Sequence, residues 1–245
     1  LLGPSPDGLR FFQLNQFVLR NERLEVFACP SARRSDIFYR SIRGGPGKRM
    51  FDVALGLLAI LVLSPLLLGL ALAVKLSDSG PAFFGQTRIG ADGKAFKVWK
   101  FRTMVPDADL RLREYLSRNP AAECEWQDAR KLRSDPRVTR LGHVLRKYSV
   151  DELPQLFNII IGEMSFVGPR PITEAECVLY GKSLRHYLAC RPGLTGIWQV
   201  SGRNDVSYRR RVALDRLYST RWTPILDIIL LIKTVPVALS GRGSY

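Results

Sequence analysis

The stretch LVLSPLLLG (61–69) lies near the middle of an uncharged segment, Val53–Val74, that consists almost entirely of Leu, Ala, Val and Ile. As a helix this segment would extend about 33 Å, enough to cross a bilayer core of about 30 Å. Pro65 lacks a backbone N–H, clashes with the carbonyl of Leu61 and disfavours a helical conformation at Ser64. The Ser64 hydroxyl can hydrogen-bond a backbone group that the proline frees. We therefore expect a membrane helix that breaks at Ser64–Pro65.

Basic residues flank this segment at both ends. They are Arg40, Arg43, Lys48 and Arg49 before it, and Lys75, Arg88, Lys94, Lys97, Lys100 and Arg102 after it. A helix that crosses once should carry its basic excess at the cytoplasmic end. Because both flanks have this character, we expect a re-entrant helix-break-helix that returns to the cytoplasmic side. A kinked helix that spans the membrane stays open as the alternative.

The chain as a whole is strongly basic. Its 245 residues carry 37 Lys and Arg against 22 Asp and Glu, a formal net charge of +15, and 28 of the basic residues are Arg. Arginine binds phosphate bidentately, so this balance favours phosphate chemistry or an anionic surface, although an Arg-rich genome explains it equally well. The four cysteines have neither zinc-like nor disulfide-like spacing and indicate a reducing, cytoplasmic compartment.

The rest of the chain is predicted to be of α+β class and mainly helical. Residues 81–104 alternate and contain Asp92-Gly93, a pattern typical of a β-hairpin. Helical spacing follows in the ranges 107–118, 139–148, 151–161, 173–189, 207–221 and 224–239. Residues 165–173 are expected to form a loop, and 191–205 a loop or short strand. The last helix is apolar but carries Asp227 and Lys233, so we expect it either at the membrane interface or in the core.

The candidate chemistry centres on LRKYSVDELPQLFN (145–158), which contains adjacent carboxylates at Asp151 and Glu152. Ser149 and Glu152 fit a capping box, which would place the pair at a helix start. The helix dipole and the neighbouring basic residues are expected to favour the ionised form of both. An ionised Asp can serve as a nucleophile toward phosphorus or as a Mg²⁺ ligand, whereas a capping acid without chemistry is the alternative.

Four blocks occur in order: GKRMFDVALGLLAILVLSPLLL, FFGQTRIGADGKAFKVWKFRTM, LRKYSVDELPQLFNIIIGEMSFVGPRP and RPGLTGIWQVSGRN. Together they make residues 46–240 resemble the bacterial sugar transferase family, the monotopic phosphoglycosyl transferases. The resemblance implies transfer of hexose 1-phosphate from a UDP-sugar to undecaprenyl phosphate with release of UMP. The product would prime exopolysaccharide assembly at the cytoplasmic face of the bacterial inner membrane, among its lipids. In this family Asp151 would be the covalent nucleophile.

The resemblance also implies roles for individual residues. Asp151 and Glu152 would hold Mg²⁺, and Ser64–Pro65 would turn the membrane helix. The substrate-binding candidates that match family motifs are Lys100, Arg102, Arg146, Arg170 and Arg203. From their charge, Lys48, Arg49 and Asp52 are expected to anchor the membrane helix at the lipid headgroups.

The resulting division is an accessory N-terminal arm (1–47), a re-entrant membrane helix (48–76) and a cytoplasmic catalytic domain with membrane-associated C-terminal helices (77–245). Nucleic acid is not expected as a partner, because a basic nucleic-acid-binding protein has no need of the apolar segment. An inactive membrane scaffold of the same fold is the rival function. Galactose, glucose and an acetamido sugar all stay open as the donor sugar, as does a homodimer.

Overall fold

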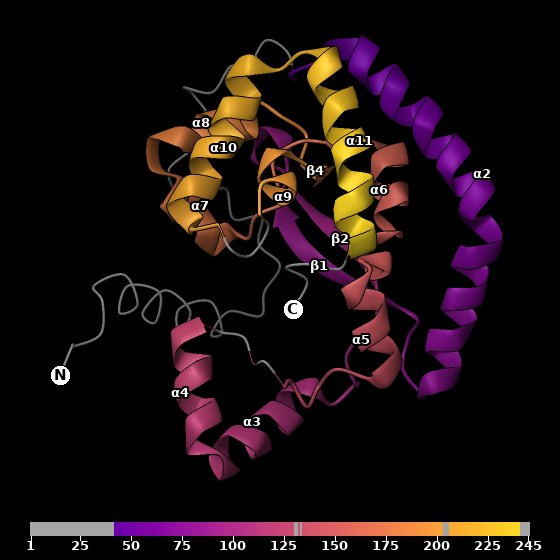
Figure 1. Ribbon diagram of the computed structural model, residues 1–245, viewed down its shortest axis with the longest axis vertical. Helices are drawn as coiled ribbons and strands as arrows, with labels where there is room; N and C mark the ends of the chain where they lie inside the picture. The colour runs from indigo at the N-terminus through magenta and orange to yellow at the C-terminus, as the bar shows by residue number, and fades with distance from the viewer. Residues whose placement is uncertain (1–41, 130–131, 133, 203–205, 241–245) are drawn as a thin grey trace.

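The computed structural model describes residues 42–129, 132, 134–202 and 206–240. Residues 1–41 of the predicted arm and Arg203 lie outside this set. The helices are α2 (Gly45–Ser77), α3 (Ala108–Arg118), α4 (Pro120–Ala129), α5 (Arg140–Lys147), α6 (Gln155–Ile161), α7 (Glu174–Tyr180), α8 (Leu184–Leu188), α9 (Ile197–Val200), α10 (Tyr208–Arg221) and α11 (Pro224–Ser240). The strands are β1 (Phe83–Ile89), β2 (Ala95–Phe101), β3 (Ser165–Val167) and β4 (Gly193–Thr195), and short 3-10 helices are η1 (Ala91–Gly93), η2 (Val150–Glu152) and η3 (Gly181–Ser183). The mainly helical α+β class is thus confirmed (Figure 1).

Helix α2 contains the whole apolar segment and runs through Pro65 as one 33-residue helix, not as two helices separated by a break. Ser64 Oγ donates to the Leu61 carbonyl at 2.9 Å. That carbonyl is the one that Pro65 cannot bond, so the hydroxyl replaces the missing hydrogen bond inside the helix. The helix therefore continues where the sequence predicted a break, and Figure 1 shows it bowed around the side of the domain.

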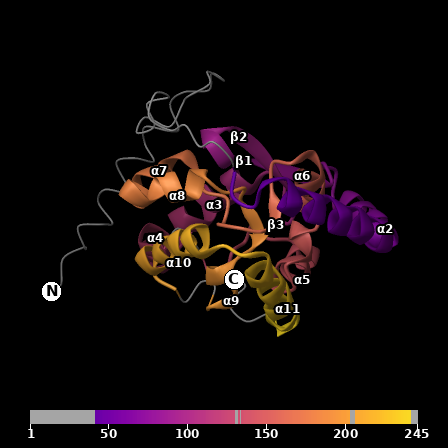
Figure 2. The same cartoon turned by 90° about the horizontal axis from the view of Figure 1, so that it is seen from above.

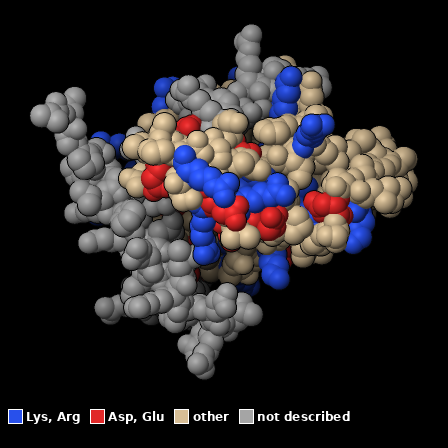
Figure 3. Space-filling model, turned by 90° about the horizontal axis from the view of Figure 1, so that it is seen from below, with Lys and Arg blue, Asp and Glu red and all other residues tan. Residues whose placement is uncertain are grey.

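The outer surface of α2 is apolar. Among the described residues, α2 is the one helix long and apolar enough to cross a membrane, and only 11% of its most apolar window is buried. The exposed side chains include Leu57, Leu58, Leu61, Val62, Leu66, Leu68 and Leu72. Figure 3 shows this part of the molecule as an uncharged projection beside a charged central region. Such a contiguous apolar surface indicates contact with a membrane.

The predicted hairpin is confirmed. β1 and β2 pair antiparallel from Phe83↔Phe101 to Ile89↔Ala95. Asp92 and Gly93 take φ values of 55° and 75° in the turn, the left-handed conformation that an Asp-Gly pair adopts readily.

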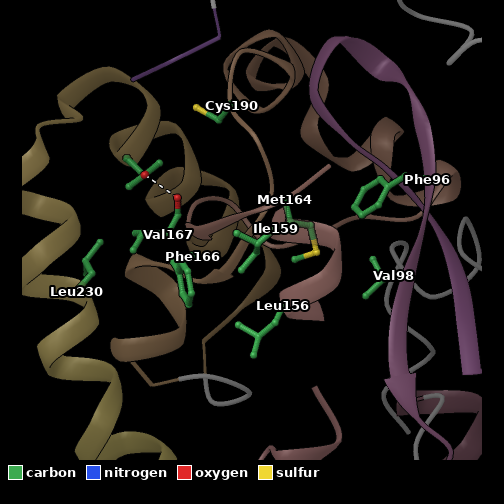
Figure 4. Packing of buried hydrophobic residues seen from close by; sticks show 10 residues of the cluster. Phe96, Val98, Leu156, Ile159, Met164, Phe166, Val167, Cys190 and Leu230 are labelled. Atoms are coloured by element: carbon green, nitrogen blue, oxygen red, sulfur yellow. Dashed lines mark hydrogen bonds between the residues drawn. The ribbon is translucent and has the colours of Figure 1, made fainter. Parts of the chain in front are cut away.

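The main core lies where the hairpin, α6, β3 and α11 meet (Figure 4). Its buried side chains include Phe96, Val98, Leu156, Ile159, Met164, Phe166, Val167 and Leu230. β3 and β4 form a two-stranded parallel pair, which corrects the expectation that residues 165–173 are wholly loop. Tyr218 Oη donates to the Val167 carbonyl at 2.8 Å and so ties α10 to this pair. The core thereby fixes the loop that follows β3.

The charged residues at the start of α2 bind other parts of the folded domain. They therefore do not lie at the lipid headgroups, where the sequence had led us to expect them. Lys48 Nζ lies 2.5 Å from Asp227 Oδ2 of α11, and both side chains are almost fully buried. Arg49 donates hydrogen bonds to the carbonyls of Ile159 and Ile160 at the end of α6, where the Ile159 carbonyl also accepts from the N–H of the C-cap residue Gly162. Asp52 is fully buried. These residues face inward because each finds a partner there that offsets the cost of burying charge.

Asp52 also connects α2 to β3. Its Oδ1 accepts hydrogen bonds from Ser165 Oγ at 3.0 Å and from the Phe166 backbone N–H at 3.1 Å. The other end of α2 returns to the domain as well, because Leu67 and Val74 pack with Phe101 and Leu145 in a second cluster. Both ends of the apolar helix therefore contact the same folded unit.

Candidate active site

The two adjacent carboxylates lie in η2, the single 3-10 turn between α5 and α6. Ser149, immediately before it, has a left-handed backbone with φ 55°, and its side chain makes no capping hydrogen bond. The predicted capping box is therefore wrong. Instead the Glu152 N–H bonds the Ser149 backbone carbonyl at 3.2 Å. The turn places Asp151 inward and buried, while Glu152 stays about one-third exposed.

Lys100, near the end of β2, bridges the two carboxylates. Its Nζ lies 2.5 Å from Glu152 Oε1 and 3.8 Å from Asp151 Oδ2. The hairpin thus places a cation beside Asp151 and Glu152, called the dyad below, from a segment about fifty residues earlier in the chain. The structure therefore places Lys100, a predicted substrate-binding residue, beside Asp151 and Glu152.

Burial controls the charge on Asp151. The pKa of its carboxyl is raised to about 6, mainly by desolvation and also by the charge of Glu152, while Lys100 and Arg146 act in the opposite direction. The expectation that its surroundings favour the ionised form is therefore wrong, because loss of water outweighs the nearby positive charges. With a pKa of about 6, most of this carboxyl is still ionised at neutral pH.

Arg146 is held beside the dyad by Thr103. Its Nε donates to Thr103 Oγ1 at 2.8 Å. Burial lowers the pKa of Arg146, and the nearby charge of Asp151 raises it. Gly142 makes this approach feasible, because a Cβ at that position would lie 2.2 Å from the Thr103 carbonyl oxygen. The sequence identified Arg146 but missed Thr103, although Thr103 belongs to the quoted FRTM motif.

Asp135 is a second residue that the sequence did not identify. Its carboxylate accepts hydrogen bonds from Arg137 Nε at 2.8 Å and Nη2 at 2.7 Å. Its charge also raises the pKa of Arg146 against the effect of burial. Asp135 therefore stabilises the positive charge of Arg146 in its buried position through a long-range charge interaction that has no sequence signature.

Two predicted substrate-binding residues lie elsewhere. Arg102 forms an ion pair with Asp78, directly after α2. Arg170 places its guanidinium carbon 5.4 Å from the ring centroid of Trp198. Within the described ranges, no ion pair or hydrogen bond joins either guanidinium to the dyad. Arg203 lies outside those ranges.

The dyad is compatible with a Mg²⁺ ion shared with substrate. Across the described residues there is no cluster of three or more His, Cys, Asp or Glu side chains that could hold a metal by itself. Mg²⁺, however, is commonly bound by one or two carboxylates together with substrate phosphates. Asp151 and Glu152 already converge on one cation, the Lys100 ammonium, and therefore present the donor set that such an ion needs.

Comparisons with known proteins identify the family of this chain. The sequence model of a family described as bacterial sugar transferase matches residues 44–241. An "Exopolysaccharide production protein ExoY" from Sinorhizobium fredii is 54% identical over 202 residues, which cover 82% of this chain and 89% of that protein. An "Undecaprenyl-phosphate galactose phosphotransferase" from Salmonella typhimurium is 46% identical over 198 residues, covering 81% of this chain and 41% of that protein. A "UDP-glucose:undecaprenyl-phosphate glucose-1-phosphate transferase" from Escherichia coli is 38% identical over 208 residues, covering 81% and 41%.

Proposed function

Because the chain belongs to the bacterial sugar transferase family, we propose that it transfers hexose 1-phosphate from a UDP-sugar to undecaprenyl phosphate and releases UMP. The enzyme is a phosphoglycosyl transferase, and its relatives include proteins named for galactose and for glucose transfer. The product would prime exopolysaccharide assembly. The observation that carries this proposal is a buried carboxylate, Asp151, flanked by two cations, Lys100 and Arg146, beside an apolar membrane helix.

The proposed chemistry proceeds in two displacements at one phosphorus. A carboxylate oxygen of Asp151 attacks the β-phosphorus of the UDP-sugar. The bond from this phosphorus to the bridging oxygen breaks, and UMP leaves with that oxygen. A phosphate oxygen of undecaprenyl phosphate then attacks the same phosphorus. This second displacement releases the Asp151 carboxylate and forms the lipid-linked diphosphate sugar.

The surroundings of Asp151 suit this role. Partial desolvation keeps the carboxylate basic, while Lys100 and Arg146 can neutralise charge on the phosphoryl oxygens of the approaching diphosphate. Asp151 and Glu152 would hold Mg²⁺, which when bound would supply further neutralisation of those oxygens.

We further propose that α2 enters the cytoplasmic leaflet without crossing the membrane. In support, both ends of the helix are attached to one domain: Lys48 and Asp52 near its start, Val74 near its end. A helix that spans a bilayer about 30 Å thick separates its ends by that distance, with water on opposite sides. The enzyme would then lie on the cytoplasmic face of the inner membrane, where both substrates meet.

A transfer assay tests the proposal directly. Purified full-length protein, undecaprenyl phosphate and Mg²⁺ are incubated with UDP-galactose, UDP-glucose or UDP-N-acetylglucosamine, and UMP release is measured. We expect lipid-dependent UMP release with at least one donor. With UDP-sugar alone, intact mass should increase by one hexose phosphate in wild type and not in Asp151→Asn. An adduct on another residue would refute the role of Asp151, and no release with any donor would leave the rival scaffold function.

A further inference from the structure

The side-chain amide of Asn158, on α6, takes the place of a neighbouring strand along one edge of β2. Its Oδ1 accepts a hydrogen bond from the Trp99 N–H at 3.1 Å, and its Nδ2 donates to the Lys97 carbonyl at 2.7 Å. A residue of a parallel strand opposite Val98 would make the same two bonds, because in a parallel ladder each residue bonds the two neighbours of the residue that it faces. Among the described residues β1 alone pairs with β2 as a strand, and Asn158 occupies the other edge.

The orientation of this amide is fixed by a complete set of partners. Asn158 is 0% exposed, and its Nδ2 also donates to Glu163 Oε2 at 2.6 Å. Turning the amide over would set its NH₂ group against the Trp99 N–H and its oxygen against a carbonyl and a carboxylate. Buried donors and acceptors need partners, so the packed protein permits only the observed orientation.

Asn158 lies on the same continuous stretch of helix as the dyad. The Leu156 N–H bonds the Leu153 carbonyl at 3.0 Å, so helical hydrogen bonding continues from the end of η2 into α6. On the other side of the contact, Lys100 directly follows Trp99 in β2. Both ribbon views show β2 beside α6 (Figures 1 and 2). Asn158 thus joins the strand that carries Lys100 to the helical segment that begins with the dyad.

Apolar packing between β2 and α6 does not fix their relative position by itself. Val98 is buried against Leu156 and Ile159 of α6 (Figure 4). Lys100 lies two positions beyond Val98 and therefore on the same face of the strand. Apolar contacts are non-directional, whereas hydrogen bonds have a narrow range of length and angle. The hydrogen bonds of Asn158 therefore determine where β2 lies along α6.

We propose that Asn158 is a positioning residue of the transfer reaction, which places the Lys100 ammonium at the dyad by fixing β2 against α6. This inference rests on the proposed function, in which Lys100 neutralises phosphoryl oxygens of the UDP-sugar. Lys100 Nζ lies 2.5 Å from Glu152 Oε1 and 3.8 Å from Asp151 Oδ2. The side-chain hydrogen bonds of Asn158 go to β2 and Glu163, so it acts through Lys100 and does not touch the reacting groups.

A zero-length cross-link reports the position of Lys100 without any turnover. A carbodiimide joins a carboxylate to an amine in contact with it, and peptide mass spectrometry of the detergent-purified full chain quantifies the Lys100–Glu152 amide. Tyr187→Phe is the matched control, because Tyr187 is buried and donates to the Ile89 carbonyl at 2.6 Å, at the other end of the hairpin. We expect Asn158→Leu to lower the yield at least about fivefold, as loss of one hydrogen bond does, and Tyr187→Phe less than about twofold. Equal yields in wild type and Asn158→Leu would overturn the proposal.

Thermal unfolding of each variant shows whether Asn158→Leu folds, and a milder pair of variants serves where it does not. Glu163 is only partly buried. Glu163→Leu removes the acceptor that helps to orient the amide, whereas Glu163→Gln keeps an acceptor oxygen. We expect Glu163→Leu to lower the Lys100–Glu152 yield about threefold and Glu163→Gln to leave it at the wild-type value. In that case, equal yields for these two variants would overturn the proposal.

Transfer kinetics test whether Asn158 acts through Lys100. Asn158→Leu should lower kcat/KM by about 10²-fold, the effect of displacing a reacting group by about 1 Å. Its effect should divide between kcat and KM as that of Lys100→Met does, because both variants remove the same cation from the dyad. In the double variant, Asn158→Leu should add less than about threefold to the loss caused by Lys100→Met. Losses that multiply would overturn a role through Lys100.

The cross-link and the transfer assay together keep this inference distinct from the proposed function. A wild-type protein that transfers no sugar, with a cross-link that depends on Asn158, would overturn the function and leave the placement of Lys100 intact. A wild-type protein that transfers sugar, with the full cross-link yield and full rate in Asn158→Leu, would overturn the inference and leave the function intact.

Discussion

The buried ion pair between Lys48 and Asp227 is expected to hold the membrane helix α2 to α11, and replacing Lys48 by Met tests this. The two side chains are only 6% and 5% exposed, and Asp227 also accepts from Tyr218 Oη at 2.8 Å and Trp222 Nε1 at 3.0 Å. Lys48→Met leaves the carboxylate buried with two neutral donors. Removing one partner of such a pair costs about 3–5 kcal/mol. At roughly 2–4 °C per kcal/mol for a chain of this size, the unfolding midpoint should fall by about 6–20 °C.

The assay is thermal unfolding of the full chain in detergent, followed by near-ultraviolet circular dichroism. Lys75→Met is the matched control, because Lys75 is an exposed lysine of the same helix with a single 3.4 Å contact to the Gly80 carbonyl. Its midpoint should stay within about 2 °C of wild type, as for other surface substitutions. The double variant Lys48→Met/Asp227→Leu should recover most of the loss, since an apolar pair needs no partner charge. Equal midpoints for Lys48→Met and Lys75→Met would refute the attachment of α2 through this pair.

Five further results are expected. Folding raises the pKa of Asp151 from 3.8 to about 6, so its ionised form destabilises the fold above that range. Asp151→Asn should therefore raise the free energy of unfolding at pH 7 by about 3 kcal/mol, and this gain should disappear below pH ~4. An unchanged denaturation midpoint across this pH range would contradict the desolvation argument. Wild-type adduct formation should fall about tenfold per pH unit below pH 6, in stopped-flow or quenched single turnovers, as the nucleophile is protonated. Glu152→Gln should raise the Mg²⁺ concentration for half-maximal rate about tenfold, and an unchanged titration would exclude Glu152 as a ligand. Arg146→Ala should lower kcat by about 10²–10³-fold with a smaller effect on KM, and the reverse split would place Arg146 at a ground-state contact. Single cysteines at Ser41 and Ser79 should both resist an impermeant thiol reagent in intact cells and react in inverted membranes; labelling of Ser41Cys alone from outside would establish a spanning helix.

Local pattern in the sequence was sufficient for several elements. The hairpin follows from alternation around Asp92-Gly93, and α3, α5, α10 and α11 follow from helical spacing. The apolar composition of Val53–Val74 predicted that this segment is helical, although not that the helix is continuous. The adjacent carboxylates, with Arg146 a few residues before them, also stand out in one short motif. These features share a physical basis, because each depends on neighbours within one or two turns of chain.

Other conclusions needed the packed structure. The sequence predicted a break at Pro65, but the Ser64 hydroxyl restores the lost hydrogen bond and the helix continues. Neighbouring charges predicted an ionised Asp151, but burial outweighs them. Desolvation depends on which segments cover a residue, and that information is distributed over the whole chain.

Partner choice among the charged residues was likewise decided by the tertiary structure. Lys48 looked like a headgroup anchor and instead reaches Asp227, 179 positions away along the chain. Arg102 and Arg170 looked equivalent to Lys100, yet only Lys100 contacts the dyad. A charge is attracted by whatever opposite charge or aromatic face lies within a few ångströms, and only the fold determines which groups come that close.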